Sequence, residues 1–186
     1  MSESARFILA TFCGIVLAAL VHIAIVFGMP MLSEQDAFSR ITMMTGGERA
    51  ELIAAPGGQH TWLPQPDPTT AVAACAYNLE NGPIRVSAKT GALFQSLSFH
   101  TRGGGIFFAV TDRAAIRGGL DLVVMTRRQL DEILAAEDEE EPSRDVRIVS
   151  PKHEGIVVVR VLAPLPSLHA QAEEVAKSVT CAVEPY

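Results

Sequence analysis

The sequence predicts an α+β protein: an N-terminal transmembrane helix is followed by one domain, in which two to three helices accompany a mainly antiparallel β-sheet. Three features predict this class. An uncharged apolar segment comes first, several short β-rich segments bounded by turn residues follow, and two segments with helical spacing lie in the last third of the chain. Strand pairs that outnumber helices are typical of an α+β domain on an antiparallel sheet. The predicted boundaries are 1–29 for the anchor and 30–186 for the domain.

The first element is the segment Phe7–Gly28, which carries no Asp, Glu, Lys or Arg. A helix that crosses the hydrocarbon core of a membrane needs about 20 such residues, and this segment lacks the polar stripe of a surface helix. We therefore expect an uncleaved, single-pass anchor that contacts the lipid bilayer through residues 7–28. A cleaved signal peptide is the alternative, because Val26 and Gly28 are small enough to precede a cleavage site.

Two side chains of this segment are not simple hydrocarbons. His22 lies about two turns from the far end, where a neutral imidazole reaches headgroups or water, so we expect an interfacial position. A functional role for His22 is the alternative. Cys13 lies inside the span and is expected to behave as a small apolar residue.

The remaining cysteines, Cys75 and Cys181, lie near the beginning and at the end of the domain. Such a pair forms a disulfide if the domain faces an oxidising compartment, whereas two buried free thiols are expected in the cytosol. Composition alone leaves both readings open. No CxxC motif or Cys/His cluster is present, so a structural zinc site is not expected.

The central part of the chain predicts three β-hairpins. The first covers 69–88 and turns at an Asn-Gly pair, since both residues accept the positive φ that such turns require. The second covers 91–113, with three glycines at its reversal, and the third covers 146–164. The segment 121–126 is predicted as a separate short strand.

Three helices are predicted in the domain. Residues 126–141 begin with a Thr-x-x-Gln capping box and carry opposite charges four residues apart. Residues 166–181 place apolar side chains on one face, and a shorter helix is predicted within 33–47. Trp62, the single tryptophan, lies in a turn-rich loop and is expected to pack on the domain's own core.

Composition and motifs exclude several classes of function. The net charge is −6 and no basic patch occurs, so nucleic acid is not an expected partner. The sequence has no glycine-rich phosphate loop. The acidic run Glu137–Glu141 lacks the spacing of oxygen ligands and the central glycine of a calcium loop, and is predicted as a solvated loop. We therefore expect no cofactor and no metal.

Three residues of the second predicted hairpin, Ser98, His100 and Asp112, are the candidate nucleophile, base and orienting group of a periplasmic hydrolase-like enzyme. Ser98 and His100 lie two residues apart on one strand, a spacing that does not by itself set up the required hydrogen bonds. No GxSxG elbow is present. The sequence therefore predicts no catalytic residues, and the enzyme remains the alternative hypothesis.

The pair Asp112-Arg113 stands where the second hairpin ends. An Asp followed by an Arg at this place fixes a corner through backbone hydrogen bonds and a salt bridge, and this structural role is predicted ahead of ligand binding. Together with Phe94 at the beginning of the hairpin, Asp112 and Arg113 form a possible structural or binding motif.

These motifs occur in an order that resembles a bacterial family catalogued as domain of unknown function 1254, in its short, membrane-anchored form. The resemblance covers most of the chain: the N-terminal span, Asp67-Pro68, Cys75 within CAYNLENGP, the hairpin FQSLSFHTRGGGIFFAVTDR, and a final Cys after the last helix. The family usually has an aromatic pair before the Ser-Leu of this hairpin. Here Phe94 is kept, whereas Gln95 replaces the Trp.

The resemblance implies a cell-envelope protein of the inner (cytoplasmic) membrane, single-pass, with its C-terminal domain extracytoplasmic, in the periplasm. It strengthens the Cys75–Cys181 pairing, and it implies an envelope partner, the family-based expectation being a protein with domain of unknown function 1214. No enzymatic activity follows from it. The predicted function is therefore a non-enzymatic binding or assembly module, whose ligand and oligomeric state the sequence does not define.

Overall fold

The structure is a computed structural model that describes residues 2–32, 36–45, 48–58, 61–136 and 145–184. The chain divides into two compact units, Met1–Asp36 and Ala37–Tyr186. The acidic run Glu137–Glu141, predicted as a solvated loop, lies outside the described residues.

The first unit consists of one long helix, α1 (Glu3–Leu32). Its segment Glu3–Met29 is long and apolar enough to cross a membrane, and none of its most apolar window is buried within the protein. A helix satisfies its own backbone hydrogen bonds, which is the condition for crossing hydrocarbon. The predicted apolar helix is therefore present, and both Cys13 and His22 are exposed on it.

The second unit contains three α-helices and nine β-strands among the residues that the structure describes. The helices are α2 (Ala37–Met44), α3 (Arg127–Ala136) and α4 (His169–Lys177). The strands are β1 (Glu51–Ala54), β2 (Thr70–Asn78), β3 (Ile84–Lys89), β4 (Gln95–Thr101), β5 (Ile106–Thr111), β6 (Gly119–Met125), β7 (Val146–Val149), β8 (Glu154–Leu162) and β9 (Thr180–Val183).

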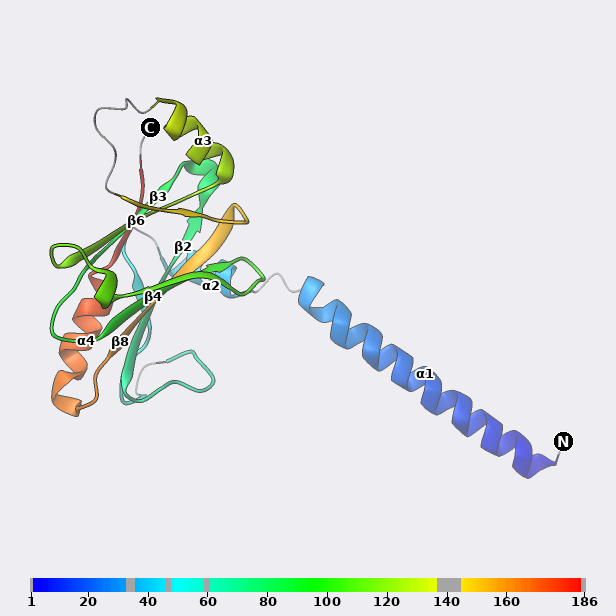
Figure 1. Cartoon of the computed structure of the whole chain (residues 1–186). Coiled ribbons are helices and arrows are strands. Elements are labelled where there is room, and N and C mark those ends of the chain that lie inside the picture. Colours follow the sequence, from blue (N-terminus) through cyan, green and yellow to red (C-terminus); the bar gives the residue numbers. More distant parts are fainter. Residues whose placement is uncertain (1, 33–35, 46–47, 59–60, 137–144, 185–186) are drawn as a thin grey trace. The chain divides into compact units, whose positions relative to one another are not determined.

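These strands form two sheets (Figure 1). The five-stranded sheet has the order β1-β2-β8-β4-β5 and is antiparallel throughout. The four-stranded sheet has the order β7-β6-β3-β9, in which β6 and β7 are parallel. Parallel neighbours need a crossover, which α3 provides. The predicted class, an α+β domain with mainly antiparallel pairing, is confirmed.

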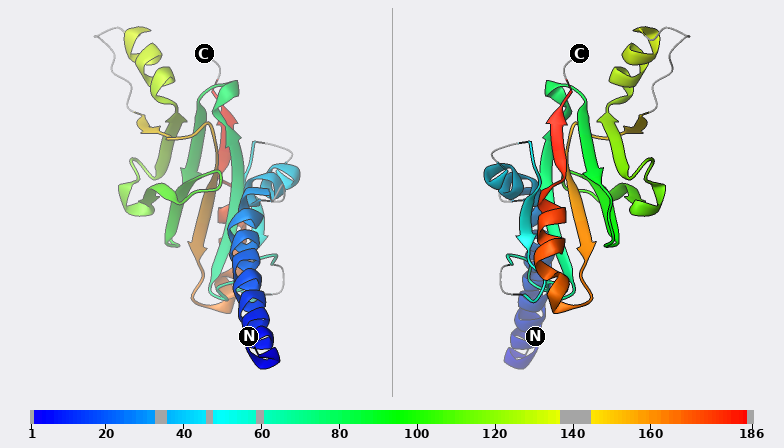
Figure 2. Two further views of the ribbon diagram at one scale, coloured as in Figure 1. Left: turned by 90° about the vertical axis from the view of Figure 1, so that its right-hand side faces the viewer. Right: turned by 90° about the vertical axis from the view of Figure 1, so that its left-hand side faces the viewer.

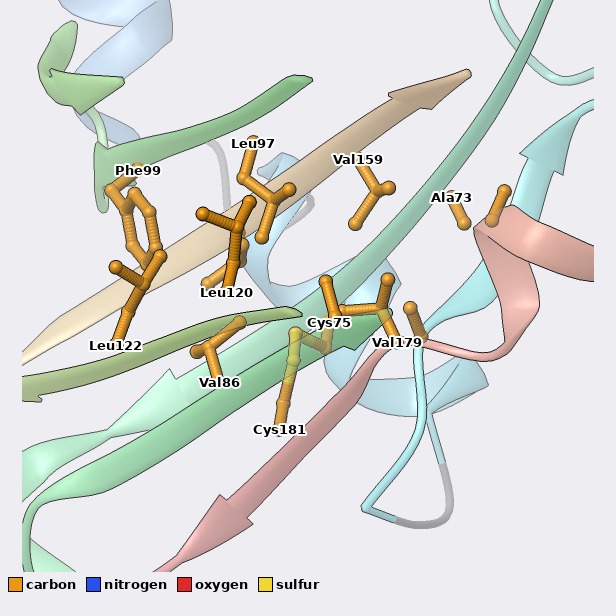
Figure 3. Packing of buried hydrophobic residues seen from close by; sticks show 14 of the residues in the cluster. Ala73, Cys75, Val86, Leu97, Phe99, Leu120, Leu122, Val159, Val179 and Cys181 are labelled. Atoms are coloured by element: carbon orange, nitrogen blue, oxygen red, sulfur yellow. A yellow bond between two sulfur atoms is a disulfide. The ribbon is translucent and has the colours of Figure 1, made fainter. Parts of the chain in front are cut away.

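The hydrophobic core lies between the inner faces of the two sheets (Figure 3). Leu97 and Phe99 on β4 come from the five-stranded sheet, and Val86 on β3 with Leu120 and Leu122 on β6 come from the other. All five side chains are buried. Because side chains alternate along a strand, the intervening residues of β4 and β8 point to the opposite face of the five-stranded sheet, its outer face.

Two helices pack on opposite faces of the five-stranded sheet (Figure 2). The helix α4 adds Ala172 and Ala176 to the main core. On the outer face, Ile41 of α2 packs with Val158 in a second, smaller apolar cluster, against which Trp62 is placed. The prediction that Trp62 packs on the domain's own core is therefore confirmed. This cluster covers the β1, β2 and β8 part of the outer face.

A disulfide joins the two sheets. Cys75 on β2 is bonded to Cys181 on β9, with a Cα–Cα distance of 6.6 Å and a sequence separation of 106 residues. Both cysteines belong to the main core, where Figure 3 shows the bond. The pairing expected from the sequence is thus present, and it fixes the last strand of the chain to an early one.

Two of the three predicted hairpins are wrong. In the first, β2 pairs with β1 and β8, whereas β3 pairs with β6 and β9 in the other sheet. The Asn-Gly pair does not form a two-residue turn: residues 79–81 form a 3₁₀ turn capped by the Asn78 side chain, and only Gly82 has a positive φ, of 128°. In the third, β7 is parallel to β6, and β8 lies between β2 and β4. The second hairpin, β4–β5, is confirmed.

The predicted helices are confirmed with different ends. The α3 capping box is formed, because the Thr126 N–H donates to Gln129 Oε1 at 2.8 Å and the Gln129 N–H donates to Thr126 Oγ1 at 3.2 Å. The last helix is shorter than predicted: α4 ends at Lys177, and Cys181 lies in β9, which was not predicted as a strand.

One glycine is required by the close packing of β8. A methyl group on Gly155 would overlap the Tyr77 hydroxyl and the His100 carbonyl oxygen. Tyr77 is buried and its hydroxyl lies 3.4 Å from both that carbonyl oxygen and Ser150 Oγ. Gly155 therefore makes room for a buried tyrosine that ties β2 to the neighbouring loop.

An ion-pair group joins segments at the end of the four-stranded sheet. The Arg85 guanidinium on β3 donates two hydrogen bonds to the Asp145 carboxylate, at 2.7 and 3.1 Å, and two to Glu184 Oε1, at 2.6 and 3.2 Å. Bidentate pairing of this kind is the stronger class of surface ion pair. The two carboxylates, Asp145 first, raise the pKa of Arg85.

Candidate functional site: the open face of the five-stranded sheet

The part of the outer face that α2 and Trp62 leave uncovered is formed by β4, β5 and the end of β8. We call it the open face. Its residues are Ser96, Ser98 and His100 on β4, Ala109 and Thr111 on β5, and Arg160 on β8. Strand alternation places all of them on one side, opposite the core residues Leu97 and Phe99.

Two of the predicted catalytic candidates contact each other on the open face. Ser98 Oγ lies 3.1 Å from His100 Nε2, so residues two apart on one strand do form the hydrogen bond that their spacing did not guarantee. Ser98 is buried, and its hydroxyl also lies 3.4 Å from the Val158 carbonyl oxygen. Burial, and secondly the positive charge of Arg160, lower the pKa of His100, which keeps the imidazole neutral near pH 7.

The third candidate, Asp112, lies elsewhere. Thr111 pairs with Ser96, so the next residue, Asp112, lies level with Gln95. His100 lies in the other direction along β4, beyond Ser98. The Oδ1 atom of Asp112 is buried and has no hydrogen-bond partner among the described residues. Asp112 therefore does not orient His100, and the structure does not assemble the Ser98–His100–Asp112 triad. The three residues belong to one hairpin, but the strand register places Asp112 several residues away from His100 along the strands.

The corner after β5 also differs from its prediction. The Ala115 N–H donates to the Asp112 carbonyl oxygen at 3.0 Å, so backbone hydrogen bonding at the corner is present. The expected salt bridge is absent from the described residues: Arg113 is exposed, whereas part of the Asp112 carboxylate is buried. Phe94, 44% exposed, accepts a backbone hydrogen bond from Leu162 at the adjacent end of the sheet.

Arg160 is the open-face residue that sequence reasoning missed. It is exposed on β8, directly opposite Ser96 on β4, and its Nη1 donates to Ser98 Oγ at 3.4 Å. The available signal was a single charge within the apolar run IVVVRVL of a central strand. A lone Arg at that position predicts a side chain directed away from the core.

The edge of the five-stranded sheet at β5 is a second feature of this region. The sequence of β5, IFFAVT, contains no charge, and the strand pairs only with β4 among the residues that the structure describes. Two other edges make further backbone hydrogen bonds: the backbone N–H of Trp62 donates to the Ile53 carbonyl oxygen beside β1, and the backbone N–H of Cys181 donates to the Glu48 carbonyl oxygen beside β9. An uncharged, uncovered edge strand is a template for pairing with another chain.

A hollow of about 730 Å³ lies between β1 and α4, with Glu51, His169, Glu173 and Lys177 among its lining residues. Lys177 Nζ pairs with Glu173 Oε2 at 3.8 Å, so its charges partly compensate each other. No group of three or more His, Cys, Asp or Glu side chains that could hold a metal occurs among the described residues. The described residues that line the hollow include no Ser, Thr or Cys nucleophile beside a base.

Comparisons with known proteins give the fold alone. No family model matches the chain, and no curated protein shows significant similarity to it. The VPA0106 protein from Vibrio parahaemolyticus is similar in structure, with a TM-score of 0.53 and 11% identity over 76% of this chain and 31% of that one. An uncharacterised protein from Burkholderia cenocepacia has a TM-score of 0.47 and 10% identity over 81% of this chain and 40% of that one. The chain therefore spans less than half the length of either structure.

Proposed function

We propose that this protein is a membrane-anchored cell-envelope protein whose domain acts as a non-enzymatic docking module. In this proposal α1 holds the protein in the inner membrane, the domain faces the periplasm, and the edge strand β5 receives an extended segment of a companion envelope protein. The observation that carries the proposal is the uncharged β5 edge, which has no second neighbour among the described strands.

Two features support the location. The helix α1 has the length and apolar character of a membrane span. The disulfide between Cys75 and Cys181 belongs to a class of bond that persists in oxidising compartments such as the periplasm and is rare in the cytosol. A domain joined to an apolar helix and closed by a disulfide suits the outer side of an inner membrane.

The mode of docking proposed for the partner is strand addition. A segment that joins an exposed edge makes backbone hydrogen bonds with it, and pockets for alternate side chains give specificity. The match covers 31% of the VPA0106 protein, so the similar fold in that protein is joined to further polypeptide. Resemblance to the family of domain of unknown function 1254 supplies the expected companion, a protein with domain of unknown function 1214.

The enzyme hypothesis has less support. Ser98 and His100 are hydrogen-bonded, but Ser98 is buried and Asp112 lies at another position of the sheet. A Ser-His pair without an orienting carboxylate or a preformed oxyanion site lacks the main elements of acyl-transfer catalysis. The docking function is therefore the one that the geometry favours.

Position-specific crosslinking in cells tests the docking function. A photoreactive residue at Ile106, 58% exposed on β5, is compared with one at Leu134, 54% exposed on α3. The full-length protein is then purified through a C-terminal tag. We expect the Ile106 probe to capture one envelope protein in near-stoichiometric yield, and the Leu134 probe to capture none.

A charged substitution on the β5 edge provides a second test of docking. Ala109 is exposed on β5, and Ala109→Lys introduces the residue that native edge strands use to prevent pairing. This variant should abolish the Ile106 crosslink, whereas Leu134→Lys should leave it unchanged. Equal capture from both probe positions, or a crosslink that survives Ala109→Lys, would contradict docking at β5.

A further inference from the structure

The open face contains a row of polar donors that crosses three strands. Ser96 on β4 lies directly opposite Arg160 on β8 on one side and Thr111 on β5 on the other. The Cβ atoms of residues directly opposite each other on antiparallel strands are about 5 Å apart. The Arg160, Ser96 and Thr111 side chains therefore begin next to one another on the same side of the sheet, and the Arg160 guanidinium reaches Ser98 Oγ at 3.4 Å.

The donors of this row make one long hydrogen bond to the described residues. The hydroxyls of Ser96 and Thr111 have no hydrogen-bond partner among the described residues, and Arg160 makes a single contact of 3.4 Å, to Ser98 Oγ. No described carboxylate lies within ion-pair distance of Arg160. By contrast, the Arg85 and Arg102 guanidinium groups each have a carboxylate partner at 2.7 Å.

The residues behind the row add no negative charge. Ser98 Oγ is shared between His100 Nε2, at 3.1 Å, and Arg160, and the imidazole is held neutral by burial and by the guanidinium. Because Ser98 contacts both side chains, it is a positioning residue for Arg160 and His100. Among the six open-face residues, Arg160 therefore carries the single charge, which is positive, within a chain whose net charge is −6.

An apolar surface adjoins one end of the row. Phe94 precedes β4 and Leu162 ends β8, and the Leu162 N–H donates to the Phe94 carbonyl oxygen at 2.9 Å. Strand alternation gives both residues the same direction as Ser96 and Arg160, and their side chains are 44% and 39% exposed. Donors for an anion and an exposed hydrocarbon surface thus lie next to each other.

We propose that the open face binds a phosphate group, held by the Arg160 guanidinium and by the hydroxyls of Ser96 and Thr111. Donors from three strands suit a group with several acceptor oxygens, and guanidinium–phosphate hydrogen bonds are among the stronger polar contacts in proteins. Two sources carry this chemistry: the headgroup of an anionic phospholipid and a soluble phosphate ester. The exposed Phe94 and Leu162 favour the phospholipid. This inference is independent of the docking function proposed for the β5 edge.

Ligand titration of the full-length protein in zwitterionic detergent tests the proposal. The probes are inorganic phosphate and a short-chain phosphatidylglycerol below its micelle concentration, and the readout is the ring signals of isotope-labelled His100. We expect saturable shifts with both probes and tighter binding of the phosphatidylglycerol. Arg160→Gln should weaken both by about tenfold or more, as expected for loss of a charge-assisted contact.

Two further variants separate the possible outcomes. Arg49→Gln removes the same charge from an exposed arginine beside α4 and should leave both affinities unchanged. Phe94→Ser should remove the advantage of the phosphatidylglycerol and leave phosphate binding intact. If both probes bind equally and Phe94→Ser has no effect, the phosphate site stands and the ligand is a soluble ester. Absence of saturable shifts, or equal losses in Arg160→Gln and Arg49→Gln, overturns the proposal.

Discussion

Removal of the disulfide is expected to cause a large loss of stability, and the sequence separation of its cysteines sets the magnitude. The bond between Cys75 and Cys181 closes a loop of 106 residues. In the chain-entropy model, a loop of about 100 residues corresponds to about 4.7 kcal/mol at 25 °C, whereas measured contributions are typically about 2–4 kcal/mol. We therefore expect the double variant Cys75→Ala/Cys181→Ala to unfold with a free energy lower by about 2–5 kcal/mol.

Urea unfolding of the full-length protein in detergent, followed by the fluorescence of Trp62, measures this difference. With a slope of about 2 kcal/mol per molar urea, in the middle of the usual range, the midpoint should fall by about 1–2.5 M. The oxidised protein treated with reductant should shift by a similar amount, because the same loop is opened without substitution. Equal midpoints for the oxidised protein, the reduced protein and the double variant would contradict a stabilising role of the disulfide.

Three further predictions concern the packing, a titrating group and an ion pair. Gly155→Ala should lower the free energy of unfolding, measured by urea unfolding, by about 1–3 kcal/mol, since a methyl group there overlaps Tyr77. Gly91→Ala, whose methyl group meets no neighbour within 4 Å, should leave the free energy of unfolding nearly unchanged in the same experiment. The pKa of His100 is lowered from 6.5 by burial and by Arg160, so the unfolded chain binds that proton more readily. The free energy of unfolding should therefore fall as the pH drops below about 6.5 and through the folded-state pKa of His100. In unfolding curves measured at pH 5–7, His100→Gln should make the free energy of unfolding depend less on pH. The same pH dependence in His100→Gln and the unsubstituted protein would contradict this linkage. Arg85→Gln should lower the free energy of unfolding by about 1 kcal/mol, a value limited by the partial exposure of the Arg85 ion pairs. This loss should be smaller in 0.5 M salt, because salt screens the ion pairs. A loss that does not depend on salt would argue against an electrostatic origin.

The fold class was predictable because the strongest signals in this chain are local. The apolar run of α1, the capping box of α3 and the glycine-rich reversal between β4 and β5 each depend on a few neighbouring residues. Strand pairing depends on distant ones. The strand β2 is buried on both faces and lies between β1 and β8. Nothing within its own sequence distinguishes β8, where Val158 pairs with Ala74 from 84 residues away, from the next strand along the chain.

The open face was predictable only in part, for a similar reason. Ser98 and His100 are two residues apart, so strand alternation alone places them on one side. Arg160 reaches them because β8 pairs with β4, a contact between distant segments. Asp112 was misplaced because closeness in a hairpin sequence does not specify the position along paired strands.

Experiments on intact cells test whether a disulfide-closed domain is held at the outer side of the inner membrane. Spheroplasts are treated with protease and with a membrane-impermeant thiol reagent, before and after reduction. We expect the protein to remain with the membrane after alkaline extraction and its C-terminal tag to be lost to protease. Because Cys75 and Cys181 are buried, their labelling is measured on the unfolded protein, where both should react only after reduction. A protease-protected tag, with both thiols reactive in the unfolded protein before reduction, would contradict this location.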